Sequence, residues 1–419
     1  MIPPNPASPG PLEHPLPAGM RDQLPEEAQA RRALARSVLR CAELRGYGVV
    51  AVPAFEFAEV LERGLGSLDS SEVLRFIEPE SGEVAALRPD MTPQIARMIA
   101  TRLFRRPPPF RLAYEGSVVR RRAARAAARR QIPQVGVELA GRAGLGGDLE
   151  ILALVHDALQ SVQIARFSID LGDAGILRAL LAGLSAETAA LLGDAFAERD
   201  ESAVGELLRE AGVQSPVLRQ LVGLSGGEDA LREGQKLLRG TPAEGASARL
   251  GHLFDAACKA GLEGSLSVDF GEMRGWAYYT GMRFHVYAEG HGSAVGSGGR
   301  YDELLGRFGM PMPAVGFAFD LDALGAAAKH AGVAPSGPLR VLVAGPEASL
   351  RVDILRAEGL VAAAHDDAAG AEAYARAWHF SHVLLEDSLV ELATGAAMPW
   401  NAGLARRLSG RPASVVEGA

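Results

Sequence analysis

Residues 114–141, YEGSVVRRRAARAAARRQIPQVGVELAG, contain the pattern that decides the fold. In the second half of this segment, Gln134 and Glu138 alternate with Val135 and Val137. Side chains on a β-strand alternate between its two faces, so Gln134 and Glu138 point the same way. They face either a cavity or solvent, and an exposed glutamate on a half-buried strand is common.

The middle of the same segment is strongly basic. Residues 120–130 hold six arginines, separated only by alanines. The planar guanidinium group matches phosphate oxygens, so this stretch is suited to gripping phosphates or an acidic partner surface. The alternative is a solvated stretch of arginine and alanine, although six like charges repel one another and need anionic compensation. Both interpretations remain open from these residues alone.

Other segments also concentrate polar residues and glycine, namely Leu87–Thr92, Arg274–Tyr279 and Gly298–Phe319. Arg274 is either an anion-binding arginine beside the phenol donors Tyr278 and Tyr279, or part of an aromatic anchor for a sheet. The glycine-dense residues 290–299 allow a ligand to approach the backbone. They lack the Gly-Lys-Ser/Thr ending of a P-loop, so a phosphate site of that type is not indicated.

The composition restricts the class of protein. With 419 residues the chain is long enough for two or three domains, and 48% hydrophobic with 22% charged residues is typical of a globular protein. A net charge of -8 argues against coating nucleic acid through overall charge. Cys41 and Cys258 are too far apart for a CxxC site or a disulfide framework, and His379 and His382 have no third ligand nearby. We expect no bound metal.

The start of the chain and its hydrophobic stretches bear on localisation. No stretch reaches the ~18 apolar residues needed to span a bilayer. The proline-rich start lacks the basic and apolar regions of a signal peptide. We therefore expect a soluble, cytoplasmic protein that makes no use of a membrane.

Capping and turn residues divide the first half of the chain. Residues 1–16 are rich in proline and are predicted to form a disordered tail. A helix opens at Pro25, with acids in its first turn, and ends at Gly46. A strand follows over residues 49–52. Thr92 is then predicted to cap a second helix, which ends before a run of prolines.

The second half of the chain changes character twice. Residues 172–260 have the pattern of short helices rich in alanine, leucine and glutamate, and we expect a helical insertion outside the main sheet. Strands return over residues 261–333. A linker rich in proline then precedes residues 338–419, which are predicted to form a small C-terminal α/β domain of parallel type.

Taken in order, these segments resemble the core of histidyl-tRNA synthetase, a class II aminoacyl-tRNA synthetase, over about residues 17–330. Residues 114–141 match the family's motif 2 without a gap, and Arg274–Tyr279 is similar to its histidine-specific signature. The helix and strand that end at Pro53 resemble motif 1, which implies a homodimer interface. The resemblance implies an α+β fold, with an antiparallel sheet and flanking helices formed by residues 17–171 and 261–333.

The resemblance also implies a pocket for histidine. Asp90, Thr92 and Gln134 would hold the ammonium group, Arg274 the carboxylate, and Glu138 with Tyr279 the imidazole. This chemistry suits a zwitterion, because each buried charge needs an opposite or hydrogen-bonding partner. Asp90 is one methylene shorter than the family's usual glutamate, and Ala277 replaces an acid. The full set implied is Asp90, Thr92, Arg120, Gln134, Glu138, Arg274, Tyr278 and Tyr279.

Departures from the family pattern concentrate where ATP would bind. Ala323 stands in place of the motif 3 arginine that grips the phosphates, Arg122 in place of an acid, and Ile132 in place of the aromatic residue that stacks on adenine. A charge-assisted hydrogen bond contributes ~1.5–3 kcal/mol, and more where charge develops in a transition state. The loss at Ala323 alone is therefore expected to cripple amino-acid activation.

A synthetase-like chain of this kind resembles the regulatory subunit of ATP phosphoribosyltransferase, which acts in histidine biosynthesis. The resemblance implies a chain without catalytic residues or cofactors, whose partners are a short catalytic subunit, a second copy of itself and the effector L-histidine. It further implies that the arginine-rich stretch contacts a partner instead of ATP or tRNA. The alternatives are an active but diverged histidine–tRNA ligase and a histidine sensor with an unrelated partner. No cluster of basic and aromatic residues in the C-terminal region favours RNA binding.

Overall fold

The computed structural model describes residues 16–65, 73–121, 129–213, 215–271, 278–333 and 339–408. The predicted tail lies outside these ranges apart from Leu16, and so do Arg122, Arg125 and Arg274. The chain divides into two compact units. The first consists of residues 1–22 and 31–334, and the second of residues 23–30 and 335–419.

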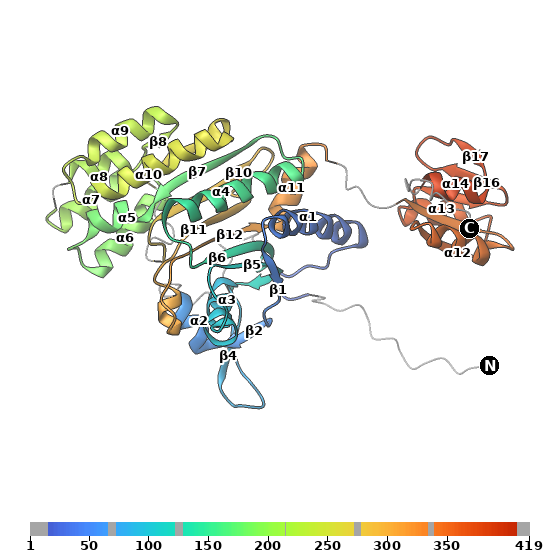
Figure 1. The fold of residues 1–419 in the computed structure, drawn as a ribbon, viewed down its shortest axis with the longest axis horizontal. Coiled ribbons are helices and arrows are strands. Elements are labelled where there is room, and N and C mark those ends of the chain that lie inside the picture. The colour runs from blue at the N-terminus through green and yellow to red at the C-terminus, as the bar shows by residue number, and fades with distance from the viewer. Residues whose placement is uncertain are drawn as a thin grey trace. The chain divides into compact units, whose positions relative to one another are not determined.

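A nine-stranded sheet forms the centre of the first unit, in the order β1, β5, β6, β12, β11, β10, β7, β9, β8 (Figure 1). The run from β5 to β7 is antiparallel, whereas β1 joins β5 and β9 joins β7 in parallel. The strands are β1 (Gly48–Val50), β5 (Phe110–Val119), β6 (Gln131–Ala140), β7 (Phe167–Asp173), β8 (Ser225–Gly226), β9 (Leu266–Asp269), β10 (Met282–Ala288), β11 (Gly296–Arg300) and β12 (Ala314–Asp320).

One face of this sheet is apolar and carries the main core. Residues opposite one another in antiparallel strands point to the same face. Val137 of β6 is opposite Ala113 of β5 and Phe317 of β12, and all of these are buried in one hydrophobic cluster. Helices α4 (Gly144–Ser161), α10 (Glu244–Ala257) and α11 (Leu321–His330) contribute to the same cluster and cover this face (Figure 1).

The other face of the sheet carries polar and small residues. The register places Glu138, Gly316, Gly299 and Arg283 in one row across β6, β12, β11 and β10. A second hydrophobic cluster, which includes Tyr301, packs at this side of the sheet. The candidate site lies along this row.

Helices and a small sheet complete the first half of this unit. Helix α1 (Pro25–Leu44) is followed by Gly46, whose φ of 82° is a left-handed conformation that glycine adopts without strain. A three-stranded sheet then follows in the order β2, β4, β3. The strands of this sheet are β2 (Phe55–Phe57), β3 (Arg75–Ile77) and β4 (Val84–Leu87). The same part of the chain forms the helices α2 (Ala58–Leu65) and α3 (Thr92–Met98), and α3 continues as a π-helix (Ile99–Leu103).

Thr92 is the first residue of α3 and not its cap, so that prediction is wrong. The Asp90 carboxylate accepts a hydrogen bond from the Thr92 N–H at 2.9 Å and satisfies a donor at the start of the helix. The Thr92 hydroxyl is thereby left for a contact with Glu138, described below.

Between β7 and β9 the chain forms a group of helices beside one end of the sheet (Figure 1). Several begin with a side-chain cap, such as Asp173 and Ser185, whose oxygens accept backbone N–H bonds. The helices are α5 (Ala174–Leu181), α6 (Ala186–Ala197), α7 (Glu201–Glu210), α8 (Pro216–Leu221), α9 (Glu228–Leu238) and α10, and turns Cys258–Leu262 and Glu263–Ser265 lead into β9.

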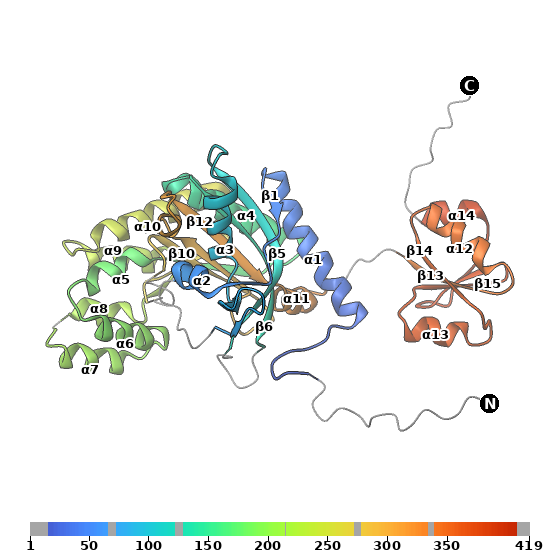
Figure 2. The same cartoon turned by 90° about the horizontal axis from the view of Figure 1, so that it is seen from below.

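The second unit is built on a five-stranded sheet in the order β14, β13, β15, β16, β17. Strands β14, β13 and β15 are parallel, as predicted. Strand β16 is antiparallel to both of its neighbours, β15 and β17. Only Glu386 and Asp387 separate β15 from β16, and such a short connection joins antiparallel strands. Helices α12 and α14 lie on one face and α13 on the other (Figure 2). Bounds are β13 (Arg340–Ala344), α12 (Ala348–Ala357), β14 (Val361–His365), α13 (Ala371–Ala377), β15 (His382–Leu385), β16 (Ser388–Glu391), β17 (Ala397–Pro399) and α14 (Ala402–Leu408).

The residues described by the structure include no helix long and apolar enough to cross a bilayer. Within the same residues, no three histidine, cysteine, aspartate or glutamate side chains gather closely enough to hold a metal ion. His382 is buried on β15, and burial lowers the pKa of its imidazole.

The glycines of β11 reflect close packing within the sheet. A Cβ added to Gly298 would lie 2.3 Å from the Gly316 carbonyl oxygen and 2.6 Å from the Phe317 Cβ. We predict that Gly298→Ala lowers the free energy of unfolding by about 1–3 kcal/mol, because a central strand must shift to accept the methyl group. Chemical denaturation measures this change. Gly292→Ala is the control, since no atom lies within 4 Å of its added Cβ, and an equal loss in both variants would contradict the packing argument.

Candidate functional site

The centre of the site is the carboxylate of Glu138, which is 4% exposed and does not face solvent. Its Oε1 atom accepts a hydrogen bond from the Thr92 hydroxyl at 2.6 Å and a long one from the Tyr114 hydroxyl at 3.5 Å. Its Oε2 atom has no hydrogen-bond partner among the described residues. Burial raises the pKa of Glu138 well above its usual range, and the bond from Thr92 opposes this shift.

Two tyrosine hydroxyls share this unsatisfied state. The hydroxyl oxygens of Tyr278 and Tyr301 are buried without a hydrogen-bond partner in the described part of the chain. A Cβ added to Gly316 would lie 2.0 Å from Glu138 Oε2 and 2.7 Å from the Tyr301 hydroxyl. The Tyr278 and Tyr301 rings are 5.3 Å apart. The carboxylate of Glu138 and the hydroxyl of Tyr301 therefore meet beside Gly316, and a native fold rarely leaves such groups unsatisfied.

Tyr301 was missed by sequence reasoning as a site residue, although it lies inside the quoted segment 298–319. A tyrosine on its own indicates packing as readily as binding. The sequence signal for Tyr301 is its position between two charged residues, Arg300 and Asp302. In the structure, both of these residues are held rigidly by other contacts.

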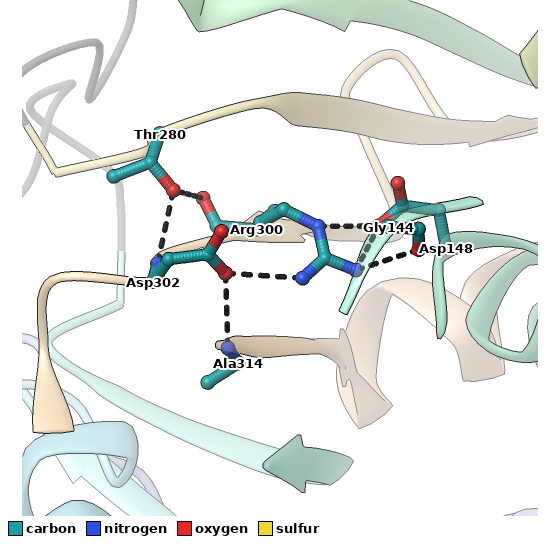
Figure 3. Close-up of polar contacts among 6 residues, drawn as sticks. All are labelled: Gly144, Asp148, Thr280, Arg300, Asp302 and Ala314. Atoms are coloured by element: carbon teal, nitrogen blue, oxygen red, sulfur yellow. Dashed lines mark hydrogen bonds and ion pairs between the residues drawn. The ribbon is translucent and has the colours of Figure 1, made fainter. Parts of the chain in front are cut away.

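Those contacts form a brace that fixes the backbone on both sides of Tyr301 (Figure 3). Arg300 donates from Nε at 2.8 Å and from Nη2 at 2.6 Å to Asp148 of α4, and from Nη1 at 3.0 Å to Asp302. Asp302 also accepts the Ala314 N–H at 3.0 Å, and its own N–H donates to Thr280 at 2.9 Å. Arg300 is 5% exposed. Arg300 and Asp302 therefore hold the backbone around Tyr301 in place. The Arg300 guanidinium group serves this brace and does not contact a ligand.

Asp90 lies close to this cluster. Its negative charge contributes to the raised pKa of both Glu138 and Tyr278, after burial as the main cause. One of its carboxylate oxygens accepts the Thr92 N–H, as described above. Asp90 and Thr92 thus approach Glu138 from the start of α3, and Asp90 brings a second negative charge to that end of the site.

Tyr279 packs edge-on against Tyr278, with ring centres 5.2 Å apart. Burial raises the pKa of Tyr279 to about 12, while the positive charge of Arg283 opposes the shift. The Arg283 guanidinium carbon lies 5.5 Å from the centre of the Tyr279 ring, and Arg283 is 5% exposed. Arg283 is a second residue that sequence reasoning missed, because a single arginine within a predicted strand carries no motif.

Gln134 and Arg120 lie further along the same face. Gln134 is half-buried on β6, opposite Gly116 of β5 and Asp320 of β12. Arg120 is also half-buried and donates from Nε to the Pro89 carbonyl at 3.4 Å. Its positive charge lowers the pKa of Tyr279 slightly, which places it near the tyrosine pair. Arg274 and Ala277 lie outside the described residues.

At the end of the site where the family resemblance would place ATP, the described residues do not form a surface suited to binding phosphates. Ala323 is 4% exposed and packs in the main hydrophobic cluster. Asp320 caps α11 by accepting the N–H groups of Asp322 and Ala323 at 2.8 and 3.2 Å. Asp322 in turn accepts hydrogen bonds from Arg129 and, at 3.0 Å, from Arg21. Arg21 and Arg129 are thus already paired with a carboxylate.

Known proteins resemble this chain in sequence. Residues 19–324 match the family model described as histidyl-tRNA synthetase. The chain is 39% identical to an ATP phosphoribosyltransferase regulatory subunit of Moorella thermoacetica, over 74% of this chain and 80% of the relative. A protein of the same name from Anaeromyxobacter sp. is 41% identical over 74% of this chain and 92% of its own length. The chain belongs to the ATP phosphoribosyltransferase regulatory subunit family.

A solved relative extends the likeness to the fold of this regulatory subunit family. It is the crystal structure of an ATP phosphoribosyltransferase regulatory subunit/histidyl-tRNA synthetase from Bacillus halodurans C. The two structures agree with a TM-score of 0.77 at 27% identity, over 89% of this chain and 98% of that chain. The predicted class II synthetase-like α+β fold is confirmed, as is the family indicated by the sequence.

The buried carboxylate generates a pH prediction for this regulatory-subunit homologue. Because the folded-state pKa of Glu138 is raised, the folded chain binds this proton more tightly than the unfolded chain. Stability from this group is therefore greatest below about pH 4.3, the usual value for glutamate, and falls as the pH rises toward the folded-state pKa. We predict that, without ligand, the thermal midpoint of the wild type falls relative to that of Glu138→Gln as the pH rises above about 4.3. Parallel midpoints at every pH would contradict the burial of an unsatisfied carboxylate.

Proposed function

We propose that the chain is a non-catalytic regulatory subunit of ATP phosphoribosyltransferase that binds free L-histidine in the Glu138 pocket. The observation that carries this proposal is the group of buried oxygens without partners, on Glu138, Tyr278 and Tyr301. Such groups destabilise a fold unless a ligand satisfies them. The names of the relatives support the role in the enzyme complex.

The imidazole of histidine fits the chemistry of these atoms. A neutral imidazole has one N–H donor and one nitrogen acceptor. Glu138 Oε2 is an acceptor without a donor, and the hydroxyls of Tyr278 and Tyr301 are donors without an acceptor in the described structure. Histidine would therefore donate from one ring nitrogen to Glu138 and accept at the other from a tyrosine.

The charged end of the amino acid has partners nearby. Asp90 is the carboxylate suited to the α-ammonium group, with the Gln134 amide oxygen as a further acceptor. Arg120 is the described cation suited to the α-carboxylate, and Arg274 is a second by family resemblance. This assignment is a proposal built on the positions of Asp90, Gln134 and Arg120 along one face of the sheet.

The ATP end of the site supports a chain that makes no bonds itself. Phosphates placed there would meet Asp320 and Asp322, and Arg21 and Arg129 are held by Asp322. An arginine at position 323 would have to leave the apolar cluster that now encloses the alanine methyl group. A histidine–tRNA ligase would need ATP gripped at this position, so we favour regulation over ligation.

Regulation requires that histidine bind one state of the complex more tightly than another, since a ligand without such a preference shifts no equilibrium. In this proposal the partner is a short catalytic subunit, and the chain also pairs with its own copy through α1 and β1. The arginine-rich stretch at residues 120–130 contacts a partner, tRNA is not bound, and the complex works in the cytoplasm.

Calorimetric titration tests the pocket. We predict saturable binding of L-histidine, weakened about tenfold or more in Glu138→Gln and clearly in Tyr301→Phe, because each variant removes one hydrogen-bonding group without changing shape. Tyr287→Phe, on β10 outside the pocket, should bind histidine as the wild type does. ATP should give no saturable heat. Tight ATP binding, or exchange of pyrophosphate into ATP that depends on histidine, would favour the ligase instead.

Reconstitution tests the role in the complex. We predict that the purified chain raises the activity of a short ATP phosphoribosyltransferase catalytic subunit and that histidine lowers the combined activity. Charge reversal by Arg125→Glu should weaken assembly, measured by size-exclusion chromatography with light scattering. Arg129→Glu is a less direct probe, because Arg129 also pairs with Asp322. Unchanged assembly in Arg125→Glu would reject the arginine-rich stretch as a partner contact.

A further inference from the structure

A second concave site lies on the face of the central sheet opposite Glu138. Arg111 precedes Leu112 on β5, and Leu112 is the residue opposite Glu138, so Arg111 points to the other face. There a cavity of 540 Å³ is lined by Arg45, Arg111 and Arg142, with Glu150 of α4 between them. None of these residues belongs to the histidine pocket proposed above. We call this cavity the arginine pocket.

Glu150, the acid of the arginine pocket, has hydrogen-bond donors on both of its carboxylate oxygens. Glu150 accepts hydrogen bonds from Arg111 Nε at 2.7 Å and Arg111 Nη2 at 3.0 Å, from the Tyr47 hydroxyl at 3.0 Å, and from Arg142. These bonds lower the pKa of Glu150 against the effect of its partial burial, so it stays ionised. Glu150 is the one acid lining the cavity in the part of the chain that the structure describes.

Positive charge remains after these pairs are formed. The carboxylate of Asp157 pairs with Arg45 from outside the cavity, so three guanidinium groups face two carboxylates. The side chains of Arg45 and Arg142 are 33% and 43% exposed, and each makes one described ion-pair contact although a guanidinium group has five N–H donors. Both arginines therefore have N–H donors beyond these ion pairs, and both side chains line the cavity.

We propose that the arginine pocket binds a small phosphate-bearing anion. A phosphate has several acceptor oxygens and a double negative charge, and the planar forks of two arginines match its geometry. Arg111 is fixed by its two bonds to Glu150, so the site is partly organised before an anion arrives. Leu149 and Ala153 form an apolar part of the lining that suits the organic portion of a phosphate ester.

An acidic side chain of another protein offers related chemistry, but the cavity favours the small anion. Its 540 Å³ falls within the range of small-molecule sites.

Calorimetric titration of the full chain, at constant ionic strength, tests the proposal with inorganic phosphate, ribose 5-phosphate and a hexaglutamate peptide. Both phosphates should bind saturably with one site per chain. Affinity should fall about tenfold or more in Arg142→Ala and in Arg45→Ala, since each removes charge-assisted donors. It should rise in Glu150→Gln, because that variant removes the negative charge nearest the ligand.

Two controls separate this site from general charge effects and from the histidine pocket. Arg166→Ala removes an exposed arginine that pairs with Glu289, and Glu138→Gln alters the opposite face of the sheet. Neither variant should change phosphate affinity. The proposal is overturned by an absence of saturable phosphate binding, by undiminished binding in the folded Arg45→Ala/Arg142→Ala double variant, by an equal loss in Arg166→Ala, or by binding of the peptide alone.

Discussion

The buried carboxylate of Glu138 is the constraint around which the first unit is organised. Removing a carboxylate from water costs several kcal/mol unless hydrogen bonds or opposite charge replace the lost hydration. Thr92 supplies one good bond, and Oε2 has none in the described structure. Gly316 makes room for this oxygen, since a Cβ at position 316 would lie 2.0 Å from it. Under the proposed function, the fold retains this group at the centre of its sheet for a ligand.

The two ends of the proposed pocket differ in how their polar groups are satisfied. At the end proposed to hold the imidazole, Glu138 and Tyr301 meet beside Gly316, and the Arg300 brace holds the backbone on both sides of Tyr301. At the other end, which we propose does not bind ATP, Asp322 pairs with arginines and Ala323 packs in the core. Charge pairing and apolar packing both stabilise that end of the fold.

Helix α4 connects features on both faces of the sheet. Asp148 reaches Arg300, next to Tyr301, while Glu150 one half-turn later holds Arg111 and Arg142 in the arginine pocket. The Cβ position of Gly147 lies 2.8 Å from the Arg142 carbonyl oxygen and 3.0 Å from Arg300 Nη2, so these two arginines are packed against the same glycine. Both anchors therefore lie within one turn of the same helix.

The sequence by itself determined the fold class, the family and the row of site residues on β6, because period-two alternation and ordered motifs are local properties of the chain. It also determined the approximate boundaries of α1, because the acids of its first turn and the glycine after its end lie close to the helix in sequence. Tertiary structure alone decided that Glu138 is buried, that Tyr301 meets it above Gly316, and that Thr92 serves Glu138 instead of capping its helix. It likewise turned β16 and β17 antiparallel and assembled the arginine pocket from residues 45, 111 and 142. These features depend on contacts between segments far apart in sequence, which no local pattern records.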